Sequence, residues 1–159
     1  MKDRIGTFAA SRRDVMLGFG AASAALVIGS GAMAQGAAAT AKADDLIKSL
    51  LKDKKPAEGK VKLEIPEIAE NGNTVPFSVE VDSPMTAADH VKAIHVVARE
   101  NPQPEIGSYF FSDKSGKASA ASRLRLSRTQ DIVALAEMSD GSFYMTKRNV
   151  KVTIGGCGG

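Results

Sequence analysis

Apolar and polar residues alternate along most of the chain between Lys60 and Ile154, and this period of two limits the fold more than any other feature of the 159 residues. In Val75–Val81, valine or phenylalanine occupies every second position. Such alternation is typical of β-strands that turn one face toward a core. Turn-forming residues, among them Asn71-Gly72-Asn73 and Ser139-Asp140-Gly141, separate the segments at intervals of about 8–12 residues. The pattern predicts a mainly β fold, an immunoglobulin-like antiparallel β-sandwich of about seven strands over residues 60–154.

One segment of this pattern is ambiguous. Asp131–Met138 is a short apolar run that fits either a helix or a buried strand, and its neighbours on both sides favour a strand. The other expected strands are residues 60–65, 75–81, 91–99, 105–111, 118–127, 143–147 and 149–154. Neither an internal repeat nor a second domain is evident.

Residues 35–59 are predicted to form a leader followed by a short N-terminal helix. Gly36–Ala43 is rich in alanine, and we expect it to be loose. Asp44–Lys54 has apolar residues at helical spacing, and Pro56 follows, so the helix should end before that proline.

The first 34 residues resemble a twin-arginine (Tat) export signal. Arg12-Arg13 precedes an apolar run, and Ala32-Met33-Ala34 supplies the small-x-small pattern of signal cleavage after Ala34. The alternative is a retained membrane anchor, but a span needs about 20 strongly apolar residues and this run is shorter and glycine-rich. We therefore expect a periplasmic protein without stable membrane association after cleavage.

The charge of the expected mature chain is close to neutral. Of the 21 basic and 18 acidic side chains, four and two respectively lie before residue 35, so the remainder has a net charge of about +1. The alkaline pI belongs largely to the signal, and no basic block indicates a nucleic-acid surface.

The only cysteine lies in the terminal sequence Gly155-Gly156-Cys157-Gly158-Gly159. Glycine loses the most backbone freedom on ordering, so we expect residues 155–159 to form a flexible swinging arm. Counted from Ile154, the arm gives the thiol a reach of roughly 10 Å. A single cysteine excludes an internal disulfide, and in an exported protein it indicates intermolecular pairing or a free reactive thiol.

The sequence supplies little local activation for this thiol. An exposed cysteine has a pKa near 8.5 and is only a few per cent thiolate at neutral pH, so partners should supply the activation. Two plainer interpretations are a buried core cysteine and an incidental thiol at a frayed terminus. Glycine on both sides opposes the first, and the oxidation risk in the periplasm opposes the second.

With its Tat-type signal, β-rich domain and terminal Gly-Gly-Cys-Gly-Gly, the chain resembles the SoxY family, the sulfur-carrier subunits of the SoxYZ complex in bacterial thiosulfate oxidation. Further similarity lies in Ser83–Thr86, Asn101-Pro102-Gln103-Pro104 and Glu137–Gly141. The resemblance implies a carrier rather than an enzyme, with Cys157 as the covalent attachment site and Gly155, Gly156, Gly158 and Gly159 as the swinging arm.

The resemblance also implies the reaction partners. A c-type cytochrome sulfurtransferase (SoxAX) would join thiosulfate oxidatively to Cys157, and a hydrolase (SoxB) would release sulfate. A sulfur dehydrogenase (SoxCD) would oxidise the remaining sulfane sulfur in organisms that possess it. SoxZ, a smaller β-sandwich protein, would form the heterodimer. No cofactor other than the sulfur intermediates on Cys157 is implied.

Other polar residues give weaker signals. His90 and His95 lie five apart, which places them on opposite faces of a strand and opposes a metal site. Asp131 and Glu137 are too far apart for an acid–base pair and are expected to be solvated or turn-related. Arg123, Arg125 and Arg128 form either an anion-attracting stripe or, more simply, a solvated face. The edge of Val75–Val81 is a candidate for pairing with a partner.

Two other function classes compete with a cysteine-based carrier. A thiocarboxylate carrier also ends in Gly-Gly, but it uses its terminal carboxyl group and works in the cytoplasm. A thiol enzyme needs a lowered thiol pKa or a second cysteine, and the terminal segment has neither a helix nor another thiol.

Overall fold

The computed structural model describes residues 31–156, with side chains from residue 37 onward. The first 30 residues, which contain Arg12 and Arg13 of the predicted export signal, lie outside the described residues. Cys157, Gly158 and Gly159 lie outside them as well.

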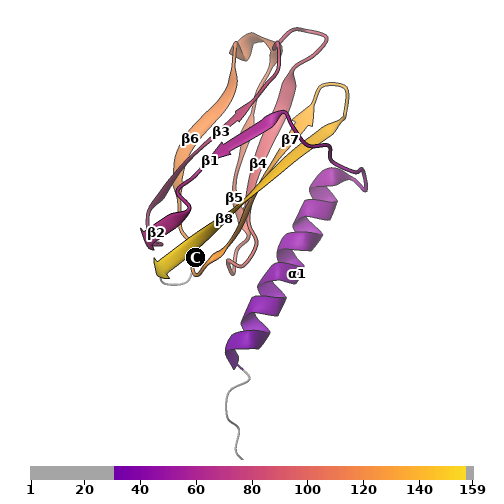
Figure 1. Cartoon of the computed structure of the whole chain (residues 1–159). Helices are drawn as coiled ribbons and strands as arrows, with labels where there is room; N and C mark the ends of the chain where they lie inside the picture. Colours follow the sequence, from indigo (N-terminus) through magenta and orange to yellow (C-terminus); the bar gives the residue numbers. More distant parts are fainter. Residues whose placement is uncertain (1–30, 157–159) are drawn as a thin grey trace, which may run out of the picture. The chain divides into compact units, whose positions relative to one another are not determined.

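The described chain is a β-sandwich with one N-terminal helix (Figure 1). The alternation in the sequence predicts the sandwich, and the helical spacing predicts the helix. One sheet has the strand order β1-β3-β6, and the other has the order β2-β8-β7-β4-β5. The elements are α1 (Gly31–Leu51), β1 (Val61–Glu64), β2 (Ile68–Asn71), β3 (Val75–Val81), β4 (Val91–Ala98), β5 (Glu105–Phe110), the 3-10 turn η1 (Asp113–Ser115), β6 (Ala118–Leu124), β7 (Gln130–Met138) and β8 (Phe143–Ile154).

The strand prediction is wrong at three places. The strand expected over residues 118–127 ends at Leu124, as β6. β2 was not expected, because its sequence Ile-Ala-Glu-Asn buries only Ala69 and shows almost no alternation. It pairs in parallel with the end of β8, so the sandwich is not wholly antiparallel. β8 is one strand rather than two, because β7 pairs with it continuously through the polar residues Lys147, Arg148 and Asn149.

The main core lies between the two sheets. Val75 and Val79 of β3 face this core, as do Val96 of β4 and Ile132 of β7, and all four side chains are almost completely buried. Burial of this kind, at about 25 cal/mol per Å² of apolar surface, is the main source of stability of such a domain.

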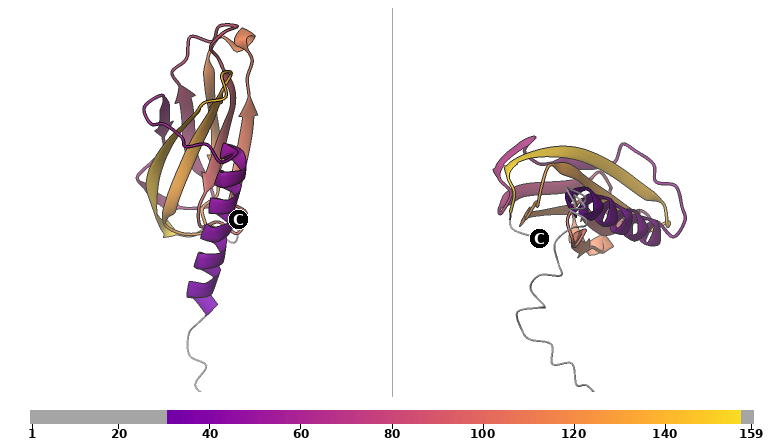
Figure 2. Two further views of the ribbon diagram at one scale, coloured as in Figure 1. Left: turned by 90° about the vertical axis from the view of Figure 1, so that its right-hand side faces the viewer. Right: turned by 90° about the horizontal axis from the view of Figure 1, so that it is seen from below.

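A second apolar layer forms where α1 covers the outer face of the five-stranded sheet (Figures 1 and 2). Ala43 of α1 packs with Val97 of β4 and Val133 of β7, and Leu51 packs with Leu135 of β7. β4 and β7 are therefore buried on both faces. This double burial explains why residues 132–136 form an unbroken apolar run in the sequence.

α1 is longer than the predicted helix. It includes Gly36–Ala43, which was expected to be loose, because this alanine-rich segment has high helix propensity. Ala34, the predicted cleavage position, lies inside α1. Among the described residues, no helix has the length and apolar character required to cross a bilayer.

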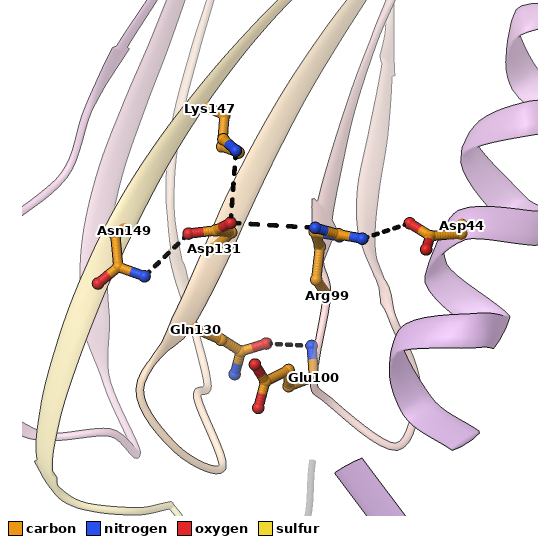
Figure 3. Close-up of polar contacts among 7 residues, drawn as sticks. All are labelled: Asp44, Arg99, Glu100, Gln130, Asp131, Lys147 and Asn149. Atoms are coloured by element: carbon orange, nitrogen blue, oxygen red, sulfur yellow. Dashed lines mark hydrogen bonds and ion pairs between the residues drawn. The ribbon is translucent and has the colours of Figure 1, made fainter. Parts of the chain in front are cut away.

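Ion pairs connect α1 to the sheet on its outer face. The guanidinium of Arg99 lies 2.6 Å from Oδ1 of Asp44 in α1 and 4.0 Å from Oδ2 of Asp131 in β7 (Figure 3). Lys52, just after α1, donates to Glu137 at 3.1 Å. Glu137 thus binds the segment just after α1, and Asp131 binds the arginine that pairs with the helix; both are partly buried in ion pairs rather than simply solvated or turn-related as predicted.

Candidate functional site

β8 brings the chain to one end of the sandwich, where the cysteine-bearing terminus begins. Val150 is fully buried in the core, whereas Ile154, the last residue of the strand, is 66% exposed. At this end β8 lies beside β2 and close to the loop between β6 and β7 (residues 125–129, below called the β6–β7 loop) (Figure 1). The terminal segment therefore emerges between two loops of the sandwich.

Three backbone hydrogen bonds close a ring around this exit point. Gly72 N–H donates to the carbonyl of Ile154 at 2.7 Å, and Leu126 N–H donates to the carbonyl of Gly72 at 2.7 Å. Gly156 N–H then donates to the carbonyl of Leu126 at 2.9 Å. We call this ring of Gly72, Leu126, Ile154 and Gly156 the arm-root clasp.

The glycines of the clasp permit close backbone approach. A Cβ on Gly72 would overlap the carbonyl oxygen of Leu126 and lie 2.8 Å from the nitrogen of Gly156. A Cβ on Gly156 would lie 2.9 Å from Oδ1 of Asn73 and 3.0 Å from the oxygen of Gly72, and one on Gly155 would overlap the oxygen of Ser127. Any side chain at these positions would force the segments apart.

These contacts change the expected extent of the swinging arm. Gly155 and Gly156 were assigned to it, but Gly156 is buried and both residues contact the β6–β7 loop. Within the described residues, the chain is held as far as Gly156. The predicted attachment site Cys157 and the predicted arm residues Gly158 and Gly159 lie beyond the description.

A buried amide pair lies behind the clasp. Asn101 and Gln130 are 2% and 1% exposed, and Gln130 Nε2 donates to Asn101 Oδ1 at 2.8 Å. Gln130 Oε1 accepts from the backbone N–H of Glu100 at 2.7 Å (Figure 3). Sequence reasoning missed both residues as parts of the site. The one available signal was Asn101-Pro102-Gln103-Pro104, which was noted as a strand break and a family resemblance only.

Three arginines lie close in sequence to Leu126 of the clasp. Arg123 is the penultimate residue of β6 and is exposed, and Arg125 and Arg128 flank the loop residues whose carbonyls meet Gly155 and Gly156. All three side chains are exposed, and none makes an ion pair within residues 37–156. The carbonyls of the loop that contact Gly155 and Gly156 therefore lie between exposed arginines in the sequence.

The two histidines do not meet. His90 Nδ1 lies 3.1 Å from the carbonyl oxygen of Thr86, ahead of β4, whereas His95 Nδ1 lies 2.7 Å from Ser108 Oγ on the face that α1 covers. Burial lowers the pKa of His95, an effect that Glu137 and Glu105 partly offset. The described residues hold no cluster of three or more His, Cys, Asp or Glu side chains able to bind a metal ion.

The expectation that Val75–Val81 pairs with a partner is wrong. This segment is β3, the central strand of the three-stranded sheet, and both of its edges are occupied by β1 and β6. Among the described residues, the edge strands of the two sheets are β1, β6, β2 and β5.

The fold and site define a class: an immunoglobulin-like β-sandwich in which the last strand leads directly to a cysteine held between glycines. The chain belongs to the SoxY family, because residues 47–157 match the model of the family described as sulfur oxidation protein SoxY. The match extends to the cysteine, and membership supports a sulfur-carrier role in the Sox system. A search of curated proteins found no match.

Among solved structures, the sulfur carrier protein SoxY from Chlorobium limicola f thiosulfatophilum is 26% identical, with a TM-score of 0.62, and the match covers 76% of this chain and 99% of that one. A superoxide reductase (neelaredoxin) from Ignicoccus hospitalis is 18% identical with a TM-score of 0.53, over 59% of this chain and 80% of that one. At that identity, the second likeness shows the fold alone.

Proposed function

We propose that this protein is a periplasmic carrier that holds thiosulfate-derived intermediates covalently on Cys157 and presents them to successive Sox enzymes. The observation on which the proposal rests is that the family match runs through the only cysteine of the chain, one residue beyond the clasp. The glycines on both sides leave that thiol with no bulky neighbour in sequence.

In the first step, the Cys157 thiol and thiosulfate are joined by a new sulfur–sulfur bond. The product is a cysteine S-thiosulfonate, one proton is released, and two electrons leave. A c-type cytochrome partner, SoxAX, would accept these electrons. The carrier itself supplies only the thiol.

In the second step, water cleaves the bond between the sulfane sulfur and the terminal sulfone. Sulfate and one proton are released, and a protonated persulfide (S–SH) remains on Cys157, so this step needs no oxidant. SoxB is the proposed hydrolase. Where SoxCD is present, it oxidises the persulfide sulfur further before another hydrolysis.

The clasp changes the geometry of presentation. Consecutive Cα atoms are about 3.8 Å apart, so a chain that is held at Gly156 gives its thiol a much shorter reach than one that is free after Ile154. An enzyme must therefore either approach the end of the sandwich closely or open the clasp. The exposed Arg125 and Arg128 suit the anionic substrate and product groups.

Export by the Tat route and heterodimer formation with SoxZ complete the proposal. Arg12 and Arg13 would form the export signal, with cleavage after Ala34, and the protein would then act in the periplasm. Residues 155–159 remain the proposed arm, now with Gly155 and Gly156 as its docked root.

The test is reconstitution in vitro with the mature protein. Incubation with thiosulfate and oxidised periplasmic extract should add one thiosulfate group to Cys157, detected by intact mass and peptide mapping. Cys157→Ser is the matched control and should remain unmodified. Adduct formation on the Cys157→Ser variant would point to the terminal carboxyl group instead, and a wild-type protein without adduct would contradict covalent carriage.

A further inference from the structure

Within the described residues, the buried amide pair Asn101–Gln130 makes no hydrogen bond to Gly155 or Gly156, yet its contacts converge on the β6–β7 loop. Asn101 Nδ2 donates to the carbonyl of Arg125 at 2.8 Å, and its Oδ1 accepts from the N–H of Ser127 at 3.1 Å. Gln130 Nε2 donates to the carbonyl of Arg128 at 3.2 Å. The two side chains thus bind the backbone on both sides of Leu126.

Leu126 is itself the centre of the clasp. Its N–H donates to Gly72 and its carbonyl accepts from Gly156, while its side chain is fully buried in the core. Fixing the carbonyl of Arg125 and the N–H of Ser127 sets the orientation of the peptide groups of Leu126. A buried amide pair with these bonds satisfied acts as a rigid support, because leaving any of the groups unpaired is costly.

We propose that Asn101 and Gln130 are positioning residues for Cys157: by fixing the β6–β7 loop, they fix the root of the carrier arm at Gly156. The proposal rests on the proposed function, in which Cys157 is the attachment site. The proposal also gives a role to the segment Asn101-Pro102-Gln103-Pro104, which follows β4. The segment places Asn101 against the β6–β7 loop that holds the arm root.

Thr129 supports the same arrangement from the other side of the loop. Its Oγ1 accepts from the N–H of Val152 at 2.9 Å, so the loop also holds β8 two residues before Ile154. The loop therefore contacts β8 and its extension at Val152, Gly155 and Gly156. Displacing it would shift the place from which the thiol is presented.

The experiment uses the fact that Cys157 is the only thiol. A nitroxide spin label attached to it reports the mobility of the arm without further substitutions. Asn101→Ala should raise the mobile fraction of the spectrum by about twofold or more, because local opening releases the root. Val81→Ala is the control: it weakens the core at the opposite end of β3 and should leave the spectrum unchanged. A folded Asn101→Ala protein with the wild-type spectrum would overturn the proposal.

A second measurement decides the question in the unmodified protein, should Asn101→Ala fail to fold. The N–H groups of Ser127 and Gly156 should show hydrogen-exchange protection that agrees within about threefold, because one opening of the loop exposes both. Exchange of Ser127 more than about tenfold faster than that of Gly156 would break the link between the amide pair and the arm root. Neither measurement requires a bound sulfur group. A negative result would therefore contradict the positioning role of Asn101 and Gln130 without bearing on the carrier function.

Discussion

Glycines serve different purposes at the two ends of the sandwich. At the end where β5 leads to β6 and β7 turns into β8, Gly116 and Gly141 have φ angles of 71° and 78°. They occupy the left-handed region that other residues avoid, and they have room for a side chain or meet only the tip of Lys54. At the arm end, Gly72 and Gly156 have no positive φ, but each lies against backbone atoms of another segment.

The comparison shows that glycine-rich sequence does not by itself indicate flexibility. At the far end, glycine allows a sharp turn. At the arm end, it allows three segments to approach closely enough for backbone hydrogen bonds, with buried amides behind them. Gly155 and Gly156 were expected to be flexible because they are glycines, but there glycine permits close backbone contact instead.

The largest expected effect is at Leu126, which joins the arm end to the core. Leu126→Ala removes a fully buried side chain and should lower the free energy of unfolding by about 2–5 kcal/mol. Chemical denaturation measures the loss. A loss below about 1 kcal/mol would contradict the placement of this side chain in the core.

The variants Gly72→Ala and Gly116→Ala test whether glycine has different roles at the two ends of the sandwich. At Gly72 the new methyl group would overlap the carbonyl of Leu126, so we expect a loss of about 2–3 kcal/mol together with greater mobility of a label on Cys157. Gly116→Ala meets no neighbour and should lose about 1 kcal/mol from backbone strain alone, with unchanged label mobility. Equal label spectra in the two variants would remove the distinction.

His95 provides a pH-dependent effect away from both ends. Burial lowers its pKa in the folded protein, so the unfolded chain takes up the proton at higher pH than the folded one. The resulting contribution to stability is complete above the unfolded pKa of about 6.5 and is lost as the pH falls through the folded value. Glu137 and Glu105 oppose this loss, and Lys52 adds to it.

Melting temperatures therefore should fall more for the wild type than for His95→Gln between about pH 7.5 and pH 5.5. The label on Cys157 should not respond, because His95 lies on the face covered by α1. Parallel pH profiles for the two proteins would contradict the assigned burial effect.

The smallest expected effect concerns the ion pair between α1 and the sheet. Asp44→Asn removes the contact with Arg99, but both side chains are partly exposed, so the loss should be below about 1 kcal/mol. The loss should shrink further at high salt. A salt-independent loss above about 2 kcal/mol would show that the pair contributes more than a partly solvated one does.

Much of the architecture could be predicted from the sequence, because half-buried strands have a clear period. Val75–Val81 alternates and its bounds were predicted correctly, and Ser139-Asp140-Gly141 forms the predicted turn between β7 and β8. β2 could not be predicted, because its pairing with β8 depends on the tertiary fold and only one of its side chains is buried.

The site was less predictable than the fold. Cys157 and its glycines are conspicuous in the sequence, but the contacts of Gly156 involve residues 30 and 84 positions earlier, Leu126 and Gly72. Asn101 and Gln130 have no periodic pattern in the sequence, because Asn101 binds the backbone of a loop 24 or more residues away and Gln130 binds Asn101 and the N–H of Glu100. Such contacts appear only once the fold brings the segments together.

The most direct test of the account is the intact mass of the protein purified from its source cells grown with thiosulfate, before and after treatment with a reductant. The account predicts a reductant-labile mass increase that maps to Cys157 and is absent from Cys157→Ser. A free, unmodified thiol in the wild-type protein under these conditions would contradict covalent carriage of sulfur by this chain.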